Sequence, residues 1–252
     1  LAQIAHMDGV RVVLLPEKMG AQHARNEGIK RAQYRYIMTM DSDDCLNPDR
    51  AVLSDGSYMD VAIDMLERSP ETAFVHGLTL MFGAFDGMTI SAYPSTEDRI
   101  VRKHHVPISA VYRKNDAEKS GGYHPSIKKW QDWSFAVGLL NARLKEGKEN
   151  KIGYLHKPYY LYRVHQRTER ISVSDVSEHD MTLATVGLYP DLFKKYYPAD
   201  SLPDIAKKVL SYKPDRLIDL LYVASHDLAL ALKMAKEREL GLLIQDAHKS
   251  IP

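Results

Sequence analysis

The sequence predicts an α/β fold, a mostly parallel mixed sheet flanked by helices, with a C-terminal α-helical appendage. Short β-branched runs alternate with segments of helical periodicity through residues 1–168. An apolar run at residues 35–40 ends abruptly in acidic residues, as strands do at the ligand-binding edge of an α/β sheet. From residue 169 helical periodicity dominates, and prolines separate the segments. We therefore expect an α/β domain over 1–168 and a helical region over 169–252.

The first α/β unit is expected before residue 40. Val10–Leu15 is β-branched and ends at a proline, which predicts a buried strand. Small and apolar residues then recur at helical spacing over 21–32, and a second strand is expected at 35–40. A strand–helix–strand unit of this kind favours a parallel pair with a right-handed crossover. Residues 1–9 are typical of the end of a helix.

The later elements follow the same alternation. We expect helices at 48–68, 116–120 and 130–144, strands at 71–81, 106–112 and 152–165, and C-terminal helices at 181–197, 202–210 and 216–249. The polar, turn-rich stretch 83–102 is expected to form a mobile loop over a site.

Composition excludes several classes of protein. Lys and Arg number 34 against 33 Asp and Glu, so overall charge gives no reason to expect nucleic acid as a partner. Cys45 is the single cysteine, which rules out an intramolecular disulfide and fits a reducing, cytoplasmic location. The richest apolar stretch, 217–232, is interrupted by charged residues, so it does not predict a membrane span.

The acids that follow the second strand suggest a metal site. Asp41 and Asp43 would leave a strand on the same side, and two carboxylates held that close favour a cation between them. A hard divalent ion such as Mg²⁺ or Mn²⁺ would also bind phosphate oxygens. The alternative is a polar turn that caps a helix, with Asp44 or Asn47 as N-cap and Pro48 opening the helix.

Three patches, in order, resemble glycosyltransferase family 2, whose fold is the Rossmann-like GT-A fold. Gly20–Gly28 followed by Tyr36–Asp44 is similar to the segment that carries the family's DXD motif. Gly121–His124 followed by Gln131–Trp133 resembles the acceptor-side segment, and Tyr162–His165 resembles the closing segment. The resemblance covers roughly residues 5–170, with Gln131 in place of the usual Glu and His124 in place of the frequent Asp.

The resemblance implies an inverting, metal-dependent glycosyltransferase that moves a sugar from a nucleotide-diphosphate donor, a UDP-sugar in particular, to an acceptor hydroxyl. Asp43 is the implied ligand of Mn²⁺ or Mg²⁺, and His165 could complete the metal shell or contact the diphosphate. Arg25, Asp41 and Arg163 would lie against the donor. Asn26 is expected to bond a neighbouring loop.

Asp132 is the implied general base, because inversion needs a carboxylate that takes the proton of the attacking hydroxyl. Its place at a helix N-terminus predicts a lowered pKa; the alternative is an ordinary N-terminal helix acid. The remaining residues of the acceptor-side segment would face the acceptor: Gly122, Tyr123, Gln131 and Trp133. A core position for Trp133 is the alternative to sugar stacking.

The family's opening strands are not found before the first patch, so we expect an N-terminally incomplete GT-A domain. Two other functions stay open: a sugar nucleotidyltransferase, which shares the α/β sheet and metal-bound phosphates, and a non-catalytic carbohydrate-binding remnant. The expected partners are a nucleotide-sugar donor and a carbohydrate or other hydroxyl acceptor. The helical tail is a candidate for peripheral membrane or homo-oligomer contact.

Overall fold

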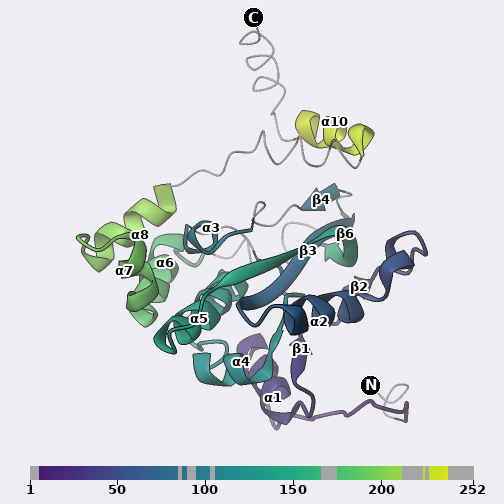
Figure 1. The fold of residues 1–252 in the computed structure, drawn as a ribbon, viewed down its shortest axis with the longest axis horizontal. Coiled ribbons are helices and arrows are strands. Elements are labelled where there is room, and N and C mark those ends of the chain that lie inside the picture. Colours follow the sequence, from purple (N-terminus) through teal and green to yellow (C-terminus); the bar gives the residue numbers. More distant parts are fainter. Residues whose placement is uncertain are drawn as a thin grey trace, which may run out of the picture.

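The computed structural model describes residues 6–84, 87–89, 95–102, 106–165, 175–211, 224 and 227–237. Its strands are β1 (Tyr36–Met38), β2 (Cys45–Leu46), β3 (Thr72–Gly83), β4 (Gly87–Thr89), β5 (Val111–Arg113) and β6 (Lys151–Val164). Its α-helices are α1 (Ala21–Arg31), α2 (Tyr58–Arg68), α3 (Glu97–Val101), α4 (Lys114–Ser120), α5 (Gln131–Lys145), α6 (Glu178–Leu188), α7 (Pro190–Tyr196), α8 (Leu202–Ser211) and α10 (Leu228–Glu237). The α/β class and the C-terminal helices are confirmed (Figure 1).

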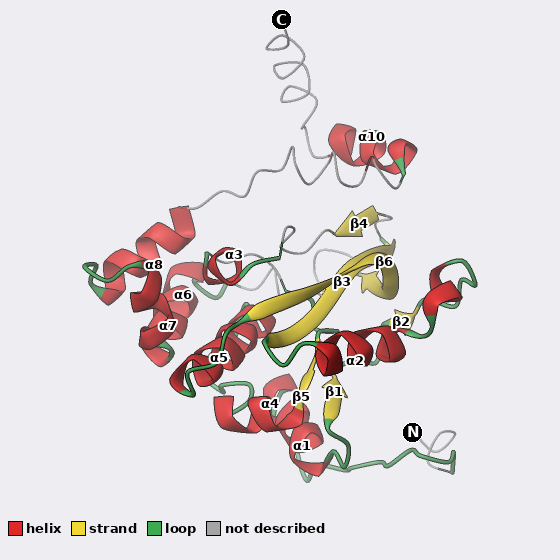
Figure 2. Cartoon of the chain, viewed as in Figure 1, coloured by secondary structure: helices red, strands yellow, loops and turns green. Residues whose placement is uncertain are grey.

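The strands form one mixed sheet in the order β1-β5-β3-β6-β2, with β4 paired to β3. The two long strands β3 and β6 run side by side and parallel, and every other pair among the described strands is antiparallel. Our expectation of mostly parallel pairing is therefore wrong for the described residues. The mixed sheet with helices on both faces is consistent with a GT-A-like fold (Figure 2).

Neighbouring residues on the strands point to opposite helical layers. Val75 and Tyr159 pack against α2, and the rings of Tyr58 and Tyr159 stack with centroids 5.7 Å apart. Phe74 and Tyr160 point to the other face, which α5 covers together with α1, α4 and the C-terminal helices. The C-terminal helices α6, α7 and α8 contribute to this same apolar core, and α7 packs on α5 and α3. The division into regions 1–168 and 169–252 stays a prediction.

The predicted strand at Val10–Leu15 is wrong. These residues form no ladder, and their side chains are largely exposed, Leu14 by 78%. The segment runs outside the sheet toward the N-terminus (Figure 1), and β1 pairs antiparallel with β5 instead. A β-branched run favours a strand only where a neighbouring strand supplies hydrogen-bond partners, and no described strand lies beside this one.

The observed bounds of other elements also differ from the predicted ones. The helix predicted from Pro48 begins only at Tyr58, because Gly56 takes a positive φ of 117° and separates it from a 3₁₀ turn at Val52–Asp55. Ser57 then caps α2 through a reciprocal capping box with Asp60. Parts of the predicted loop 83–102 and of the predicted helix 216–249 lie outside the described residues.

Candidate functional site

The acidic cluster lies on a turn beyond the strand. β1 ends at Met38, and the Asp44 amide donates to the Asp41 carbonyl at 3.2 Å, which closes a turn over the acids. The chain then enters β2, at the opposite edge of the sheet from β1. Asp41 and Asp43 therefore do not share a strand face. Because β2 follows at once, the alternative in which Asp44 or Asn47 caps a helix opened by Pro48 is wrong as well.

Asp44 anchors this acid turn (residues 41–44) to β6. Its side chain is 7% exposed and accepts hydrogen bonds from the Tyr160 hydroxyl and the Arg163 amide, each at 2.8 Å. Burial raises the pKa of Asp44, and the two donors oppose that shift. Asp44 thus holds the acid turn in place against β6.

Asp43 meets the end of β6 through two side chains. Its Oδ2 lies 2.6 Å from His165 Nε2, and Arg163 Nε donates to the Asp43 carbonyl at 2.9 Å. The hydrogen bond with His165 lowers the pKa of Asp43, and both side chains are partly exposed. Asp43, the implied metal ligand, is therefore adjacent to Arg163 and His165, although more than one hundred positions separate it from both.

Arg25 of α1 joins the acid turn to the start of α5. Its Nη2 donates to Asp41 Oδ1 at 2.9 Å, and its Nη1 donates to Gln131 Oε1 at 2.9 Å. The same Nη1 lies 3.8 Å from Asp132 Oδ1. The guanidinium also stacks over the Tyr123 ring, 5.2 Å from its centroid. One cation thus contacts the donor-side and acceptor-side candidates at once.

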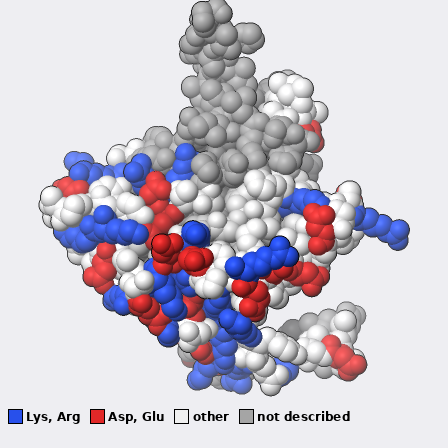
Figure 3. All heavy atoms as spheres, in the orientation of Figure 1, with Lys and Arg blue, Asp and Glu red and all other residues white. Residues whose placement is uncertain are grey.

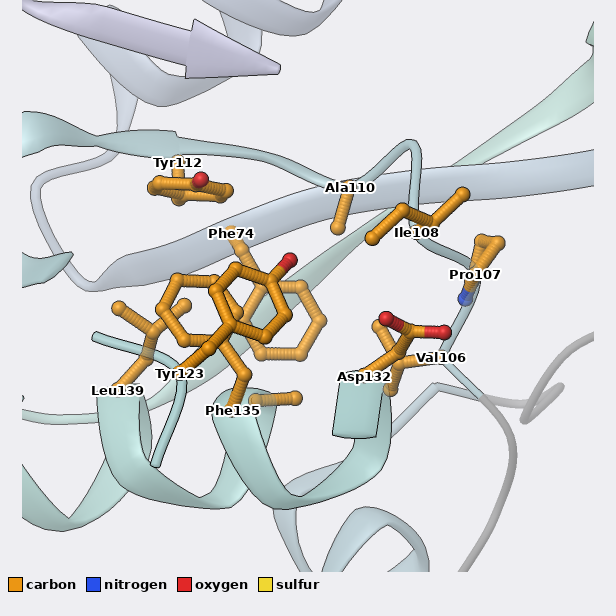
Figure 4. Close-up of a pocket in the computed structure, with 11 residues that line it drawn as sticks. Phe74, Val106, Pro107, Ile108, Ala110, Tyr112, Tyr123, Asp132, Phe135 and Leu139 are labelled. Carbon is orange, nitrogen blue, oxygen red and sulfur yellow. The ribbon is translucent and has the colours of Figure 1, made fainter. Parts of the chain in front are cut away.

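Asp132, in the first turn of α5, has two differently placed oxygens. The side chain as a whole is 31% exposed, but Oδ1 is buried and makes no hydrogen bond among the described residues. Figure 4 shows the carboxylate pointing toward the segment 106–110, at the edge of a small apolar cavity that the rings of Tyr112, Tyr123 and Phe135 also line. The cavity holds about 10 Å³, room for at most one water molecule.

Burial decides the ionisation of Asp132. Desolvation raises its pKa to about 6, Arg25 opposes the shift, and Asp41 adds to it. Our expectation that the helix N-terminus would lower this pKa is therefore wrong. Burial beside the apolar cavity destabilises the charged carboxylate more than Arg25 and the helix N-terminus stabilise it.

The acceptor-side segment is held by α1. Asn26 donates to the Tyr123 carbonyl and accepts from the Tyr123 amide, each at 2.8 Å, which confirms that Asn26 bonds a neighbouring loop. The Tyr123 ring is buried and stacks on Phe135 with centroids 4.2 Å apart. The Tyr123 ring therefore lies between the Arg25 guanidinium and the Phe135 ring, and it has no exposed face for an acceptor.

Trp133 lies in the core. Its side chain is 1% exposed, its indole nitrogen donates to the Ile100 carbonyl at 2.6 Å, and its ring meets Phe193 of α7. The expectation that Trp133 faces the acceptor is therefore wrong, since the same helix turn that points Asp132 to the site turns the next side chain inward.

Comparison with known proteins finds similarity to glycosyltransferases. The family model described as "Glycosyl transferase family 2" matches residues 1–53, the stretch that carries both Arg25 and the acid turn. A protein of Haemophilus influenzae described as an uncharacterized glycosyltransferase is 25% identical over 146 residues. Over its first 53 residues the chain is thus similar to glycosyltransferase family 2. The match to the Haemophilus influenzae protein covers 54% of this chain and 52% of that relative, so the chain spans about half the length of the curated protein it matches.

Among solved structures, a crystal structure of S. aureus TarS is similar to this chain. The sequence identity is 18% and the TM-score is 0.48. The match covers 77% of this chain and 35% of TarS.

The side chains at the acid turn fit a divalent ion in part. Among the described residues no group of three or more His, Cys, Asp and Glu side chains is arranged to hold a metal. Asp43 and His165 nevertheless form a carboxylate–imidazole pair 2.6 Å apart, and both ligand types suit Mn²⁺. A pair of protein ligands leaves the other coordination positions to water or phosphate oxygens, as is common for ions that bridge to a nucleotide.

Sequence reasoning missed the residues that hold the candidate site in shape. Tyr160 bonds Asp44, Thr39 bonds the Tyr112 hydroxyl at 3.0 Å, and the segment 106–110 closes the cavity beside Asp132. The alternating Tyr-rich run in β6 was a visible signal for Tyr160, because a tyrosine on a buried strand face needs a partner for its hydroxyl. Nothing local marks the segment 106–110.

Gly122 offers a test of the clamp between Asn26 and the acceptor-side segment. It has a φ of 72°, and a Cβ there would lie 2.4 Å from Asn26 Oδ1. We expect Gly122→Ala to lower the free energy of unfolding by about 1–3 kcal/mol, through backbone strain and displacement of Asn26. Gly121→Ala is the matched control, since Gly121 also has a positive φ but no atom within 4 Å of the added Cβ. Equal losses in urea unfolding of the two variants would contradict the clamp.

Proposed function

We propose that this chain transfers a sugar from a nucleotide-diphosphate donor, a UDP-sugar, to an acceptor hydroxyl with inversion of the anomeric centre. Arg25 and Arg163 bind the diphosphate of the donor, Asp41 lies nearer its ribose or a metal-bound water, and Asp132 takes the acceptor proton. The observation that carries the proposal is the bridge by Arg25, which contacts Asp41 at 2.9 Å and approaches Asp132 at 3.8 Å. A donor at the acid turn and an acceptor hydroxyl at Asp132 would therefore lie side by side.

The chemistry assigned to the chain's own residues follows from their environments. A general base works best with a pKa near the working pH, and burial raises the pKa of Asp132 to about 6. As the acceptor oxygen attacks the anomeric carbon, the Asp132 carboxylate accepts its proton. The sugar–phosphate bond breaks, and negative charge gathers on the leaving diphosphate near Arg25 and Arg163.

Asp43 and His165 are the residues that would hold Mn²⁺ or Mg²⁺. When bound, such an ion neutralises charge on the diphosphate oxygens. The two side chains also bond each other and keep the acid turn against the end of β6.

The surface supports a small-molecule donor over a polyanion. On the face drawn in Figure 3, basic and acidic side chains are interspersed across the described part of the molecule.

None of the helices in the described ranges has both the length and the apolar character that crossing a bilayer requires. The cytoplasmic location and any membrane or homo-oligomer contact of the helical tail stay predictions.

Calorimetry with UDP tests the donor side. We expect Mn²⁺ to strengthen UDP binding at least about tenfold, which is about 1.4 kcal/mol, because the ion joins Asp43 to the diphosphate. Asp43→Asn should remove that dependence, whereas Asp64→Asn, an exposed carboxylate on α2, should keep it. A folded wild-type chain that binds no UDP with Mn²⁺ present would overturn the proposed function.

The pH dependence of transfer tests the acceptor side. The base must be ionised, so kcat/KM should fall as the pH drops through about 6 and lose about tenfold per unit below that value. An acid limb near 4, the ordinary range of an exposed Asp, would show that Asp132 is not the group that titrates. The measurement is the initial rate of sugar transfer between pH 4.5 and 8.

A further inference from the structure

Gln131 and Asp132 are consecutive residues that approach the same nitrogen of Arg25. Nη1 donates to the Gln131 amide oxygen at 2.9 Å and stays 3.8 Å from Asp132 Oδ1. A guanidinium normally prefers a carboxylate to an amide, since charge-assisted hydrogen bonds are about twice as strong as neutral ones. The observed choice of the neutral partner therefore needs a cause in the surrounding structure.

The Gln131 amide is itself held in place. Its Nε2 donates to the Lys128 carbonyl at 3.3 Å, which turns Oε1 toward Arg25. On the other side Nη2 of Arg25 is fixed by Asp41 at 2.9 Å, and the guanidinium plane rests on the Tyr123 ring. With three supports, Arg25 cannot swing to Asp132 without losing one of them. Oδ1 of Asp132 consequently has no hydrogen-bond donor among the described residues.

We propose that Gln131 is a positioning residue: it restrains Arg25 and keeps Nη1 at ion-pair rather than hydrogen-bond distance from Asp132, so that the carboxylate remains free to accept a proton. The restraint of Arg25 by Gln131 does not depend on the proposed function, but its benefit for catalysis rests on that function. The groups that face Asp132 from the described elements are Arg25 of α1, Asp41 of the acid turn and the Tyr123 phenol.

Two substitutions of Gln131 by residues of similar size should have different effects on Asp132. Gln131→Met keeps the length of the side chain but has no acceptor, so Nη1 is released and can close on Asp132. The Asp132 titration midpoint should then fall by about one unit or more, as expected when a carboxylate gains a direct bond to a cation. Gln131→Glu retains an acceptor for Nη1 and adds a carboxylate, so the midpoint should stay or rise.

The midpoints are measured by ¹³C NMR on protein labelled at the Asp side-chain carboxyl carbons, with Asp132→Asn to assign the resonance. Gln33→Met, an exposed residue just beyond α1, is the matched control and should cause no shift. In an Arg25→Met background the effect of Gln131→Met should vanish, since the restraint acts only through Arg25. The acid limb of kcat/KM should follow the NMR midpoints.

An unchanged midpoint in Gln131→Met, or equal falls in Gln131→Met and Gln131→Glu, would overturn the proposal. The NMR result does not depend on activity. If Asp132→Asn retains full transfer while the midpoint falls in Gln131→Met and does not fall in Gln131→Glu, the proposed base is wrong and the restraint by Gln131 holds.

Discussion

Asp132→Asn is expected to lower the rate of sugar transfer by about 10²–10⁴-fold, the usual contribution of a general base. The amide keeps the size of the side chain but cannot take the acceptor proton. UDP binding with Mn²⁺ should be nearly unchanged, because Asp132 does not contact Asp43 or His165 in the described contacts. Initial rates and UDP calorimetry on the same preparation measure the two effects separately.

The fold should not suffer from this substitution. Burial raises the pKa of Asp132 above its unfolded value, so the stability it contributes is present at low pH and lost as the pH rises through about 6. At pH 8 the ionised side chain therefore opposes folding, and Asp132→Asn should melt at or above the wild-type temperature. Asp64→Asn is the activity control. If Asp132→Asn transfers sugar at the wild-type rate, Asp132 has no role in the mechanism.

Arg143→Met is expected to cost about 3–5 kcal/mol of unfolding free energy, the largest stability effect we predict. Arg143 is 2% exposed and pairs with the equally buried Asp116 at 2.8 Å. Its other donors bind Asn150 and three backbone carbonyls, those of Pro70, Glu71 and Glu149. One side chain thus ties α4 and α5 to the segments that lead into β3 and β6. Its loss leaves a buried carboxylate for which Lys148, 3.9 Å away, is the one other cation among the described ion pairs.

Urea unfolding measures this loss, and Arg68→Ala provides the contrast. Arg68 forms an exposed pair with Asp64 within α2, so its removal should cost well under about 1 kcal/mol. The double variant Arg143→Met/Asp116→Leu should recover part of the stability, because neither charge is then left unpaired. A loss below about 1 kcal/mol in Arg143→Met would contradict the assigned role.

Local patterns were sufficient where an element is stabilised mainly by its own residues. Helical spacing predicted α1, α5 and α8 to within a few residues, and the apolar run at 71–81 predicted β3. The motif residues that the sequence singled out also lie close together: Arg25, the acid turn, Asp132 and His165 form one linked set of contacts. The resemblance to family 2 came from these same residues.

Long-range contacts decided what the sequence could not. Val10–Leu15 has the composition of a strand but lies against no described strand, so its pattern is not realised. Pairing across the sheet, invisible in a local window, made β5 and β1 antiparallel.

At the site, the ionisation of Asp132 depends on an apolar segment more than twenty positions away, and desolvation there outweighs the helix end. The sequence determined which groups are present. The tertiary structure decided their partners and charge, because burial and hydrogen bonding act between residues that are distant along the chain.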